Sequence, residues 1–311
     1  MRIILNIGMA GRALPVLLAL LLPAAVSASD AGAVAAATSA GAGEPAAAIE
    51  TSFAPADEPA PGLEHGKAFT GDATPVEPGR IEVEMAYAPT WWATAGAVDR
   101  AEGERHLMGV AVGVGLLRDL DARMAVSWAF VRAAPEFPGA PTTGSGPADT
   151  SVALRWRFLR LDAPAIDLAV AAAVTIPTGL RALPDRLGTG GEAWSGALSL
   201  LASGDWGRFT TNLELGFSTV LGPQASNDVG LLVCNAAVGY QALPWLQPEL
   251  ELNYQHELEQ GQEPDESVLW GTAALVLPLD PVRLVVGARF PVMARNAAVG
   301  PMATAAVKVT F

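Results

Sequence analysis

The sequence predicts an all-β protein, a transmembrane antiparallel up-and-down β-barrel of about 12 strands with a disordered N-terminal tail. Three observations favour this fold. Apolar and polar side chains alternate with a period of two from residue 80 onward, long and short connections alternate between these segments, and the last residue, Phe311, is aromatic. Alternation with a period of two indicates strands, and the other two features are typical of bacterial outer-membrane barrels. A soluble β-sandwich is the alternative.

The N-terminus, residues 1–28, has the features of a secretory signal peptide. Arg2 and Arg12 supply positive charge, residues 14–26 are an apolar core, and Val26-Ser27-Ala28 fits a small-x-small cleavage site. The core is shorter than the roughly 20 residues of a membrane-spanning helix. We therefore expect an exported protein, with an uncleaved helical anchor as the alternative.

Residues 29–67 are rich in Ala, Gly and Pro, with scattered acidic residues and no periodicity. A segment of this composition buries too little apolar surface to offset the entropy lost on ordering. We expect a disordered periplasmic tail here, and a barrel domain over residues 68–311.

The barrel domain contains successive segments in which apolar side chains face one side and small or polar side chains the other. In the first of them, Ile81, Val83 and Met85 alternate with Glu82 and Glu84. Each segment is close to the about 9–11 residues that cross a bilayer at a tilt. The expected strands, in order, are residues 80–87, 106–117, 122–131, 150–158, 166–176, 194–202, 209–219, 230–240, 248–255, 268–277, 282–290 and 303–311.

The same period recurs from strand to strand with different residues. In the second strand Val110, Val112 and Val114 alternate with Ala111 and Gly113. The apolar faces of the next three strands are Met124, Val126, Trp128 and Phe130; Val152, Leu154, Trp156 and Phe158; and Ile166, Leu168, Val170, Val174 and Ile176. Recurrent glycines and this period argue against helices.

Connection length alternates along the chain. Outer-membrane barrels have short periplasmic turns and long external loops, and an even number of strands returns both termini to the periplasm. A soluble sandwich has no reason to sort its loops in this way. The long connections are about 88–105, 132–149, 177–193, 220–229, 256–267 and 291–302, and the short ones about 118–121, 159–165, 203–208, 241–247 and 278–281.

Aromatic residues gather at both ends of the predicted strands, as expected of two girdles at the membrane interfaces. Those at the external end are Tyr87, Trp91, Trp92, Trp128, Phe130, Trp194, Phe217, Tyr254, Trp270 and Phe290. Those at the periplasmic end are Trp156, Phe158, Phe209, Tyr240, Trp245 and Phe311.

The polar faces of the strands then point into the lumen. The charged side chains on these faces either fill and hydrate the lumen or set its selectivity for solutes, and we keep both interpretations. Arg157 and Asp167 are placed to pair across the short connection between them, and Leu269 and Leu275 are expected to face inward. The charged residues predicted to line the lumen are Glu82, Glu84, Arg123, Arg155, Arg157, Asp167, Glu214, Glu249, Glu251, Arg283, Arg289 and Lys308.

The last strand carries an expected barrel-closure signal, Val307, Val309 and Phe311. A C-terminal strand of this kind closes the cylinder, and its terminal ring lies in the interfacial girdle. The predicted partners are therefore the lipid bilayer, lipopolysaccharide and the barrel-assembly machinery, and the predicted location is the bacterial outer membrane.

Composition excludes several classes of function. The net charge is −13 with only two lysines, which argues against nucleic-acid binding. The single cysteine, Cys234, excludes an internal disulfide framework and a cysteine-cluster metal site, and His106 and His256 are too few for a metal centre. We expect no cofactor, no metal and no catalytic residue. A lipid hydrolase at the rim, with His256, Ser267 and Glu257, is the least favoured alternative because the spacing matches no defined catalytic pattern.

Four segments in this order resemble a known family, the bacterial outer-membrane barrels grouped as phenol meta-degradation pathway transporter-like proteins. The resemblance covers about residues 68–311. One departure is that Pro147 and Ala148 separate Asp149 from the glycines that precede it. The segments are Gly71-Asp-Ala-Thr-Pro-Val-Glu-Pro-Gly-Arg-Ile-Glu-Val-Glu84, Leu116-Leu-Arg-Asp-Leu-Asp-Ala-Arg123, Pro147-Ala-Asp-Thr-Ser-Val-Ala-Leu-Arg-Trp-Arg-Phe158 and Val174-Thr-Ile-Pro-Thr-Gly179.

The resemblance implies a channel that passes aromatic or other hydrophobic solutes, and it implies no catalytic residues. The sequence therefore favours an outer-membrane channel for passive passage of small, hydrophobic or aromatic solutes. The alternative is a non-conducting structural or surface-binding barrel that acts through its external loops.

Overall fold

The computed structural model describes residues 67–93, 102–134, 142–162, 165–183, 185–191, 193–221, 228–259, 265–297 and 299–311. The predicted signal peptide, residues 1–28, lies outside the described residues. The same is true of the predicted tail, residues 29–67, apart from its last residue.

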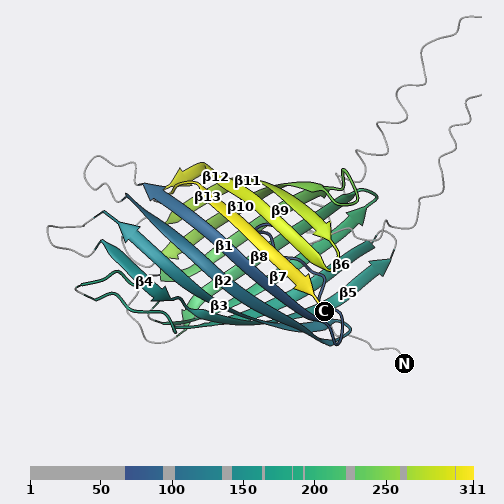
Figure 1. Cartoon of the computed structure of the whole chain (residues 1–311), viewed down its shortest axis with the longest axis horizontal. Coiled ribbons are helices and arrows are strands. Elements are labelled where there is room, and N and C mark those ends of the chain that lie inside the picture. The colour runs from purple at the N-terminus through teal and green to yellow at the C-terminus, as the bar shows by residue number, and fades with distance from the viewer. Residues whose placement is uncertain are drawn as a thin grey trace, which may run out of the picture. The chain divides into compact units, whose positions relative to one another are not determined.

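The described residues form one antiparallel sheet of 13 strands that closes on itself (Figure 1). Strand β1 pairs with β2 on one side and with the last strand, β13, on the other, with Glu82 opposite Thr310 and Tyr87 opposite Ala305. The strands are β1 (Ile81–Ala93), β2 (Glu102–Leu117), β3 (Leu120–Ala133), β4 (Thr143–Pro147), β5 (Thr150–Asp162), β6 (Ala165–Ile176), β7 (Trp194–Trp206), β8 (Phe209–Leu221), β9 (Asp228–Tyr240), β10 (Gln247–Glu259), β11 (Glu266–Leu279), β12 (Val282–Arg295) and β13 (Met302–Thr310).

Strands β4 and β5 together occupy one position in the barrel, next to β3. Strand β4 pairs with residues 128–132 of β3, and β5 pairs with residues 120–125 of the same strand. Ala148 and Asp149 interrupt the ladder between them. The barrel therefore has twelve strand positions, as the sequence predicts. Its fourth position begins at Thr143 rather than at Thr150.

The connections differ in length at the two ends of the barrel. At one end, here named the turn end, β2 joins β3, β5 joins β6, β7 joins β8 and β11 joins β12 through short turns. At the opposite end, here named the loop end, the connections are longer, and the longest runs from Ile176 to Trp194. The predicted alternation of connection length is confirmed.

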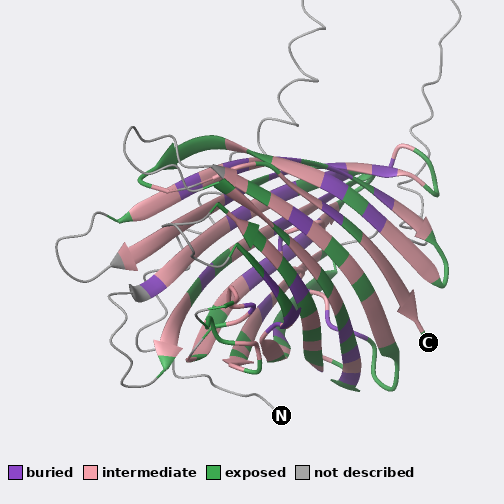
Figure 2. Cartoon of the chain, turned by 60° about the vertical axis from the view of Figure 1, so that its left-hand side comes forward, coloured by how far each residue is buried: buried purple, intermediate pink, exposed green. Residues whose placement is uncertain are grey.

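Side chains alternate between the two faces of the closed sheet, and Figure 2 shows the resulting bands of buried and exposed residues along the strands. On β10, Leu250 and Leu252 are 64% and 55% exposed, whereas Glu249 and Glu251 are 2% and 3% exposed. Apolar side chains therefore cover the outside of the barrel, and polar side chains fill the inside.

Two leucines depart from the sequence prediction. Leu275 is 48% exposed on the outer face, and Leu269, six residues earlier on β11, has the same parity. The buried residues of this strand, Val276 and Trp270 among them, are those at even positions. The inward assignment of Leu269 and Leu275 was wrong, because β11 carries apolar side chains on both faces and hydropathy alone does not determine which face points inward.

In the described part of the chain, no helix has the length and hydropathy needed to cross a membrane.

Candidate functional site

The lumen contains a segment of the chain that precedes the first strand. We name residues 67–78 the lumen segment. Two prolines, Pro75 and Pro78, and the absence of alternating side chains make it a poor strand. Its backbone N–H groups lie away from bulk water and need acceptors elsewhere. The acidic side chains on the inner face of the barrel supply most of them.

Glu251 of β10 holds the first part of the lumen segment. Its carboxylate accepts hydrogen bonds from the backbone N of Ala68 at 2.7 Å and of Phe69 at 3.1 Å. It also accepts one from the hydroxyl of Thr70 at 2.7 Å. Three donors on a buried carboxylate make this the strongest anchor of the segment, because hydrogen bonds to a charged acceptor are stronger than neutral ones.

Further contacts follow along the segment. Lys67 forms an ion pair with Glu249 at 3.0 Å, and the backbone N of Gly71 donates to Glu214 at 2.9 Å. The lumen segment therefore touches β10 and then β8 before it reaches β7, β6 and β3. The later contacts are Ala73 N to Ser203 Oγ at 2.9 Å, Thr74 Oγ1 to Asp167 Oδ2 at 3.2 Å and Val76 N to Asp121 Oδ2 at 2.8 Å.

Ion pairs reinforce the wall around the lumen segment. The guanidinium of Arg157 lies 2.8 Å from Asp167 and 2.8 Å from Asp119. The pairing of Arg157 with Asp167 that the sequence predicts is therefore confirmed. Arg155 pairs with Asp121 and also donates to the backbone oxygen of a segment residue, Asp72, at 2.8 Å.

The remaining predicted lumen residues also lie on the inner face. Arg123 pairs with Glu84 at 2.9 Å and approaches Glu82, which is the partner of Lys308. Arg283 contributes to the same cavity as these groups. The structure thus brings eleven of the twelve predicted charges to the turn-end half of the lumen. Arg289 also reaches the lumen segment, through Phe69, but it lies further toward the loop end. Whether they line a route for solutes remains a prediction.

Two cavities lie in the lumen. The turn-end cavity has a volume of about 490 Å³ and is lined by the lumen segment and by charged groups such as Glu82 and Arg123. The loop-end cavity has a volume of about 790 Å³ and is lined by Trp92, Leu107 and Trp270 together with several loop residues. Both linings mix polar and apolar side chains. Acidic and basic groups are concentrated around the first cavity, whereas the second is lined by three tryptophans, Trp91, Trp92 and Trp270.

Three side chains meet where the two cavities approach each other. The guanidinium carbon of Arg289 lies 4.4 Å from the ring centroid of Phe69 and 4.7 Å from that of Trp270. Phe69 lines the turn-end cavity, whereas Arg289 and Trp270 line the loop-end cavity. We name Phe69, Trp270 and Arg289 the aromatic–arginine cluster, and it separates the two cavities.

The positions of two tryptophans correct the sequence analysis. Trp92 and Trp270 were assigned to the external girdle, but both line the loop-end cavity, and Trp270 is only 6% exposed. For Trp92, the assignment considered height along the strand and not the face of the sheet. For Trp270, the two faces of β11 were interchanged, the same error that placed Leu269 and Leu275 inward. Trp92 shares the parity of Glu82 and Glu84 on β1, which places it on the inner face.

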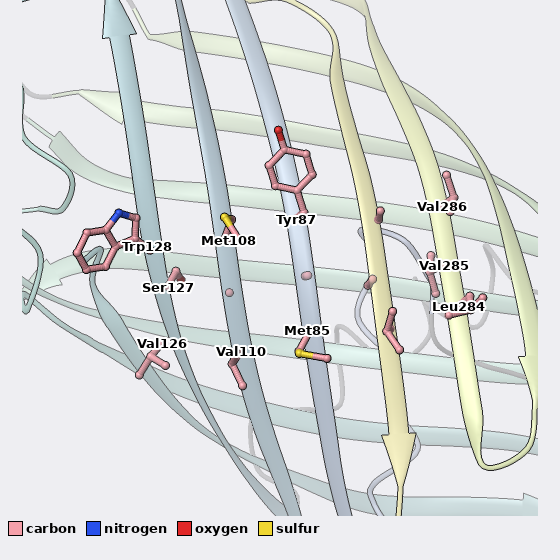
Figure 3. Close-up of a pocket in the computed structure, with 15 residues that line it drawn as sticks. Met85, Tyr87, Met108, Val110, Val126, Ser127, Trp128, Leu284, Val285 and Val286 are labelled. Atoms are coloured by element: carbon pink, nitrogen blue, oxygen red, sulfur yellow. The ribbon is translucent and has the colours of Figure 1, made fainter. Parts of the chain in front are cut away.

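The outer wall carries a separate apolar groove of about 640 Å³ across β12, β13, β1, β2 and β3 (Figure 3). Met85 and Tyr87 project from β1, Met108 from β2 and Trp128 from β3. All four side chains are exposed on the outer face. The groove therefore belongs to the outer face of the barrel and is not part of the lumen.

The residues of the rim-hydrolase alternative are not joined into a catalytic arrangement. Nε2 of His256 faces Asp265 at 3.7 Å, and its Nδ1 has no hydrogen-bond partner in the described residues. Ser267 is opposite His256 in the strand register, but no hydrogen bond joins them within the described part of the chain. Glu257 is an odd-numbered neighbour of His256 on β10 and so faces the other side of the sheet.

At the other predicted rim histidine, His106, Nδ1 lies 2.6 Å from the hydroxyl of Tyr87. No cluster of three or more His, Cys, Asp or Glu side chains is placed to bind a metal ion in the ranges that the structure describes.

Comparisons with known proteins give structural matches alone. No family model and no curated protein matches the sequence. The crystal structure of the COG4313 outer membrane channel from Pseudomonas putida F1 superposes with a TM-score of 0.63 at 14% identity, over 79% of this chain and 100% of that one. The fold is that of an outer-membrane β-barrel. The β-domain of the Bordetella autotransporter BrkA (TM-score 0.45, 10% identity, 76% of this chain and 100% of that one) and the translocator domain of NalP from Neisseria meningitidis (TM-score 0.45, 11% identity, 75% and 87%) are more distant.

The insertion of the lumen segment into the barrel was not predicted from the sequence. The acidic residues that receive it, Glu214, Glu249 and Glu251, were identified as inward-facing but were assigned to the lumen in general. A signal was present in the sequence, because these three acids lie on β8 and β10 with no inward Arg or Lys among the predicted lumen residues of those strands or of β9 between them. Unpaired inward carboxylates indicate that donors come from elsewhere in the chain.

Proposed function

We propose that this protein is an outer-membrane channel for passive passage of small, hydrophobic or aromatic solutes, and that the lumen segment narrows the channel. The observation that carries the proposal is the pair of lumen cavities separated by the aromatic–arginine cluster and the lumen segment. The segment is held by hydrogen bonds and ion pairs of side chains that can exchange partners with water. Displacement of the lumen segment therefore opens the channel in this proposal.

The tryptophans and aliphatic side chains in the lining of the loop-end cavity support the choice of solute. Trp92, Leu107, Trp270 and Met302 line it, and these side chains favour apolar or aromatic bodies over sugars. The resemblance of four sequence segments to transporter-like barrels of phenol degradation points the same way. The similarity in fold to the Pseudomonas putida channel agrees with a conducting barrel.

We also propose a topology in the membrane. The long connections of the loop end face the exterior, and the short turns face the periplasm, as in bacterial barrels generally. In this arrangement the loop-end cavity is the external vestibule. The strand that ends in Val307, Val309 and Phe311 would be recognised during assembly, and the outer surface would contact lipid and lipopolysaccharide. We infer no catalytic role.

The structure changes the interpretation of the charged residues. Glu214, Glu249 and Glu251 bind the lumen segment, and Arg155 donates to its backbone. In this proposal they control whether the channel is open. They do not select solutes directly.

The test is solute flux into liposomes that contain the refolded protein. The solutes are a charged aromatic acid and a bulky neutral aromatic, compared with sugars and ions of similar size, because phenol itself crosses bilayers. Selective flux of the aromatics above empty liposomes is the expected result. A heat-dependent shift in gel mobility verifies that the protein is folded. Flux no higher than in empty liposomes, with folded protein, would favour the non-conducting barrel that acts through its loops.

A further inference from the structure

Arg289 differs from three other arginines of the lumen. Arg123, Arg155 and Arg157 each form an ion pair with at least one carboxylate. Arg289 forms none with any described residue. Its contacts are the two rings of the aromatic–arginine cluster and a hydrogen bond from Nε to the Sδ of Met302 at 3.0 Å. Its two terminal nitrogens therefore remain available for a ligand.

The carboxylate whose charge acts on Arg289 is already committed elsewhere. Glu251 attracts Arg289 electrostatically, but its oxygens accept hydrogen bonds from Ala68, Phe69, Thr70 and Asn253. Leaving a guanidinium in aromatic surroundings without a bound anion is costly. An anion that arrives from outside would remove this cost.

The loop-end cavity gives such an anion a suitable place. Arg289 and Arg105 line it, together with one acid, Asp149. Both carboxylate oxygens of Asp149 accept backbone hydrogen bonds, from Gly179 at 2.9 Å and Gly191 at 2.6 Å. The charged side chains of the cavity therefore favour an anion, whereas its tryptophans favour an apolar body.

We propose that the loop-end cavity binds organic carboxylates with an aromatic or short alkyl body. The carboxylate pairs with the terminal nitrogens of Arg289, because the planar guanidinium matches a carboxylate in a two-point contact. The apolar body lies against Trp270 and Trp92. This inference rests on the proposed function, because it makes the acids a preferred class among the solutes that enter the vestibule.

A binding experiment separates charge from shape. Benzoate and benzamide are nearly isosteric, and only benzoate carries a negative charge at neutral pH. Each is titrated by calorimetry against the full chain in lipid nanodiscs. We expect benzoate to bind about tenfold more tightly than benzamide, as expected for one charge-assisted contact. Equal binding of the two by the unaltered protein would overturn the proposal.

Three variants sharpen the result. Arg289→Gln removes the charge and is expected to reduce the preference for benzoate to less than about twofold. Arg289→Lys keeps the charge without the planar geometry and is expected to give an intermediate preference. The control is Arg132→Gln, which removes a charge at the same end of the barrel but outside the lumen, where Arg132 lies 3.9 Å from Glu104. It is expected to keep the full preference.

Persistence of the full preference in a folded Arg289→Gln variant would overturn the site. The liposome assay distinguishes this outcome from failure of the channel proposal. Benzoate binding without flux of any solute would support the site and contradict the channel. Flux of neutral aromatics without any preference for benzoate would support the channel and contradict the site.

Discussion

The two halves of the lumen use different chemistry. At the turn end, carboxylates of β3, β6, β8 and β10 bind the lumen segment or pair with arginines. At the loop end, the cavity is lined by tryptophans and by an arginine with no carboxylate partner among the described residues. The carboxylates that bind the lumen segment are thus partnered within the chain, whereas at the loop end Arg289 pairs with no carboxylate of the described residues. In the proposed channel, the turn end holds the lumen segment in place and the loop end meets the solute.

The largest effect on the turn end is expected from Glu251→Ala. The variant removes the acceptor of Ala68, Phe69 and Thr70, and each such charge-assisted hydrogen bond contributes about 1.5–3 kcal/mol. We expect the fraction of barrels with a displaced lumen segment to rise by at least about tenfold, because the docked state loses more than 1.4 kcal/mol. Single-channel recording in planar bilayers measures this as more frequent or larger openings.

The control for that variant is Glu84→Ala. Glu84 also lies on the inner face, but its partner is Arg123 at 2.9 Å and it makes no hydrogen bond to the described residues of the lumen segment. Openings that increase equally in both variants would mean that loss of any inward charge disturbs the barrel, and that Glu251 has no special role in closure.

The second prediction concerns the stability of the turn end. Arg157→Ala leaves Asp167 without its guanidinium partner, and the side chain of Arg157 is only 6% exposed. Breaking a buried pair by removing one partner costs about 3 kcal/mol or more. We expect this loss in the free energy of unfolding in urea, followed by tryptophan fluorescence.

Arg160→Ala is the matched comparison on the same strand. Arg160 faces Asp162 at 3.5 Å with both side chains largely exposed, and such pairs contribute about 0–1 kcal/mol. Similar losses for the two variants would show that the ion pairs of the inner wall are no more important than those on the surface.

The sequence predicts the barrel better than the lumen, for a physical reason. The period of two determines which side chains face outward, so the pattern of Leu250 and Glu251 is sufficient to orient β10. The pairing of Arg157 with Asp167 was predictable because a short turn joins their strands. The docking of Gly71 onto Glu214 was not, because the two residues are far apart in sequence and no periodic pattern links them. Trp270 shows a related limit. Strand β11 has apolar residues on both faces, so the side of the sheet that the Trp270 ring occupies follows only from the pairing register.

The third prediction concerns the aromatic–arginine cluster. Phe69→Ala removes a ring 4.4 Å from the guanidinium of Arg289 but keeps the backbone hydrogen bond to Glu251. A cation–π contact contributes about 0.5–2 kcal/mol, so we expect a smaller rise in openings than for Glu251→Ala. Phe290→Ala is the control, because Phe290 is adjacent to Arg289 but is 58% exposed on the outer face. If openings increased as much as in Glu251→Ala, the Phe69 ring and not the carboxylates would be the main contact that keeps the lumen segment in place.

The smallest effect is expected at the outer wall. Tyr87→Phe removes the hydroxyl that lies 2.6 Å from Nδ1 of His106, at an exposed position where the ring keeps its apolar contacts. A hydrogen bond of this kind contributes about 0.5–1.5 kcal/mol, and exposure places it at the lower end. We expect the midpoint of urea unfolding to move little and channel openings not to change. An effect on openings comparable to that of Phe69→Ala would mean that the outer face of β1 is coupled to the lumen, and that closure does not depend on the inner contacts alone.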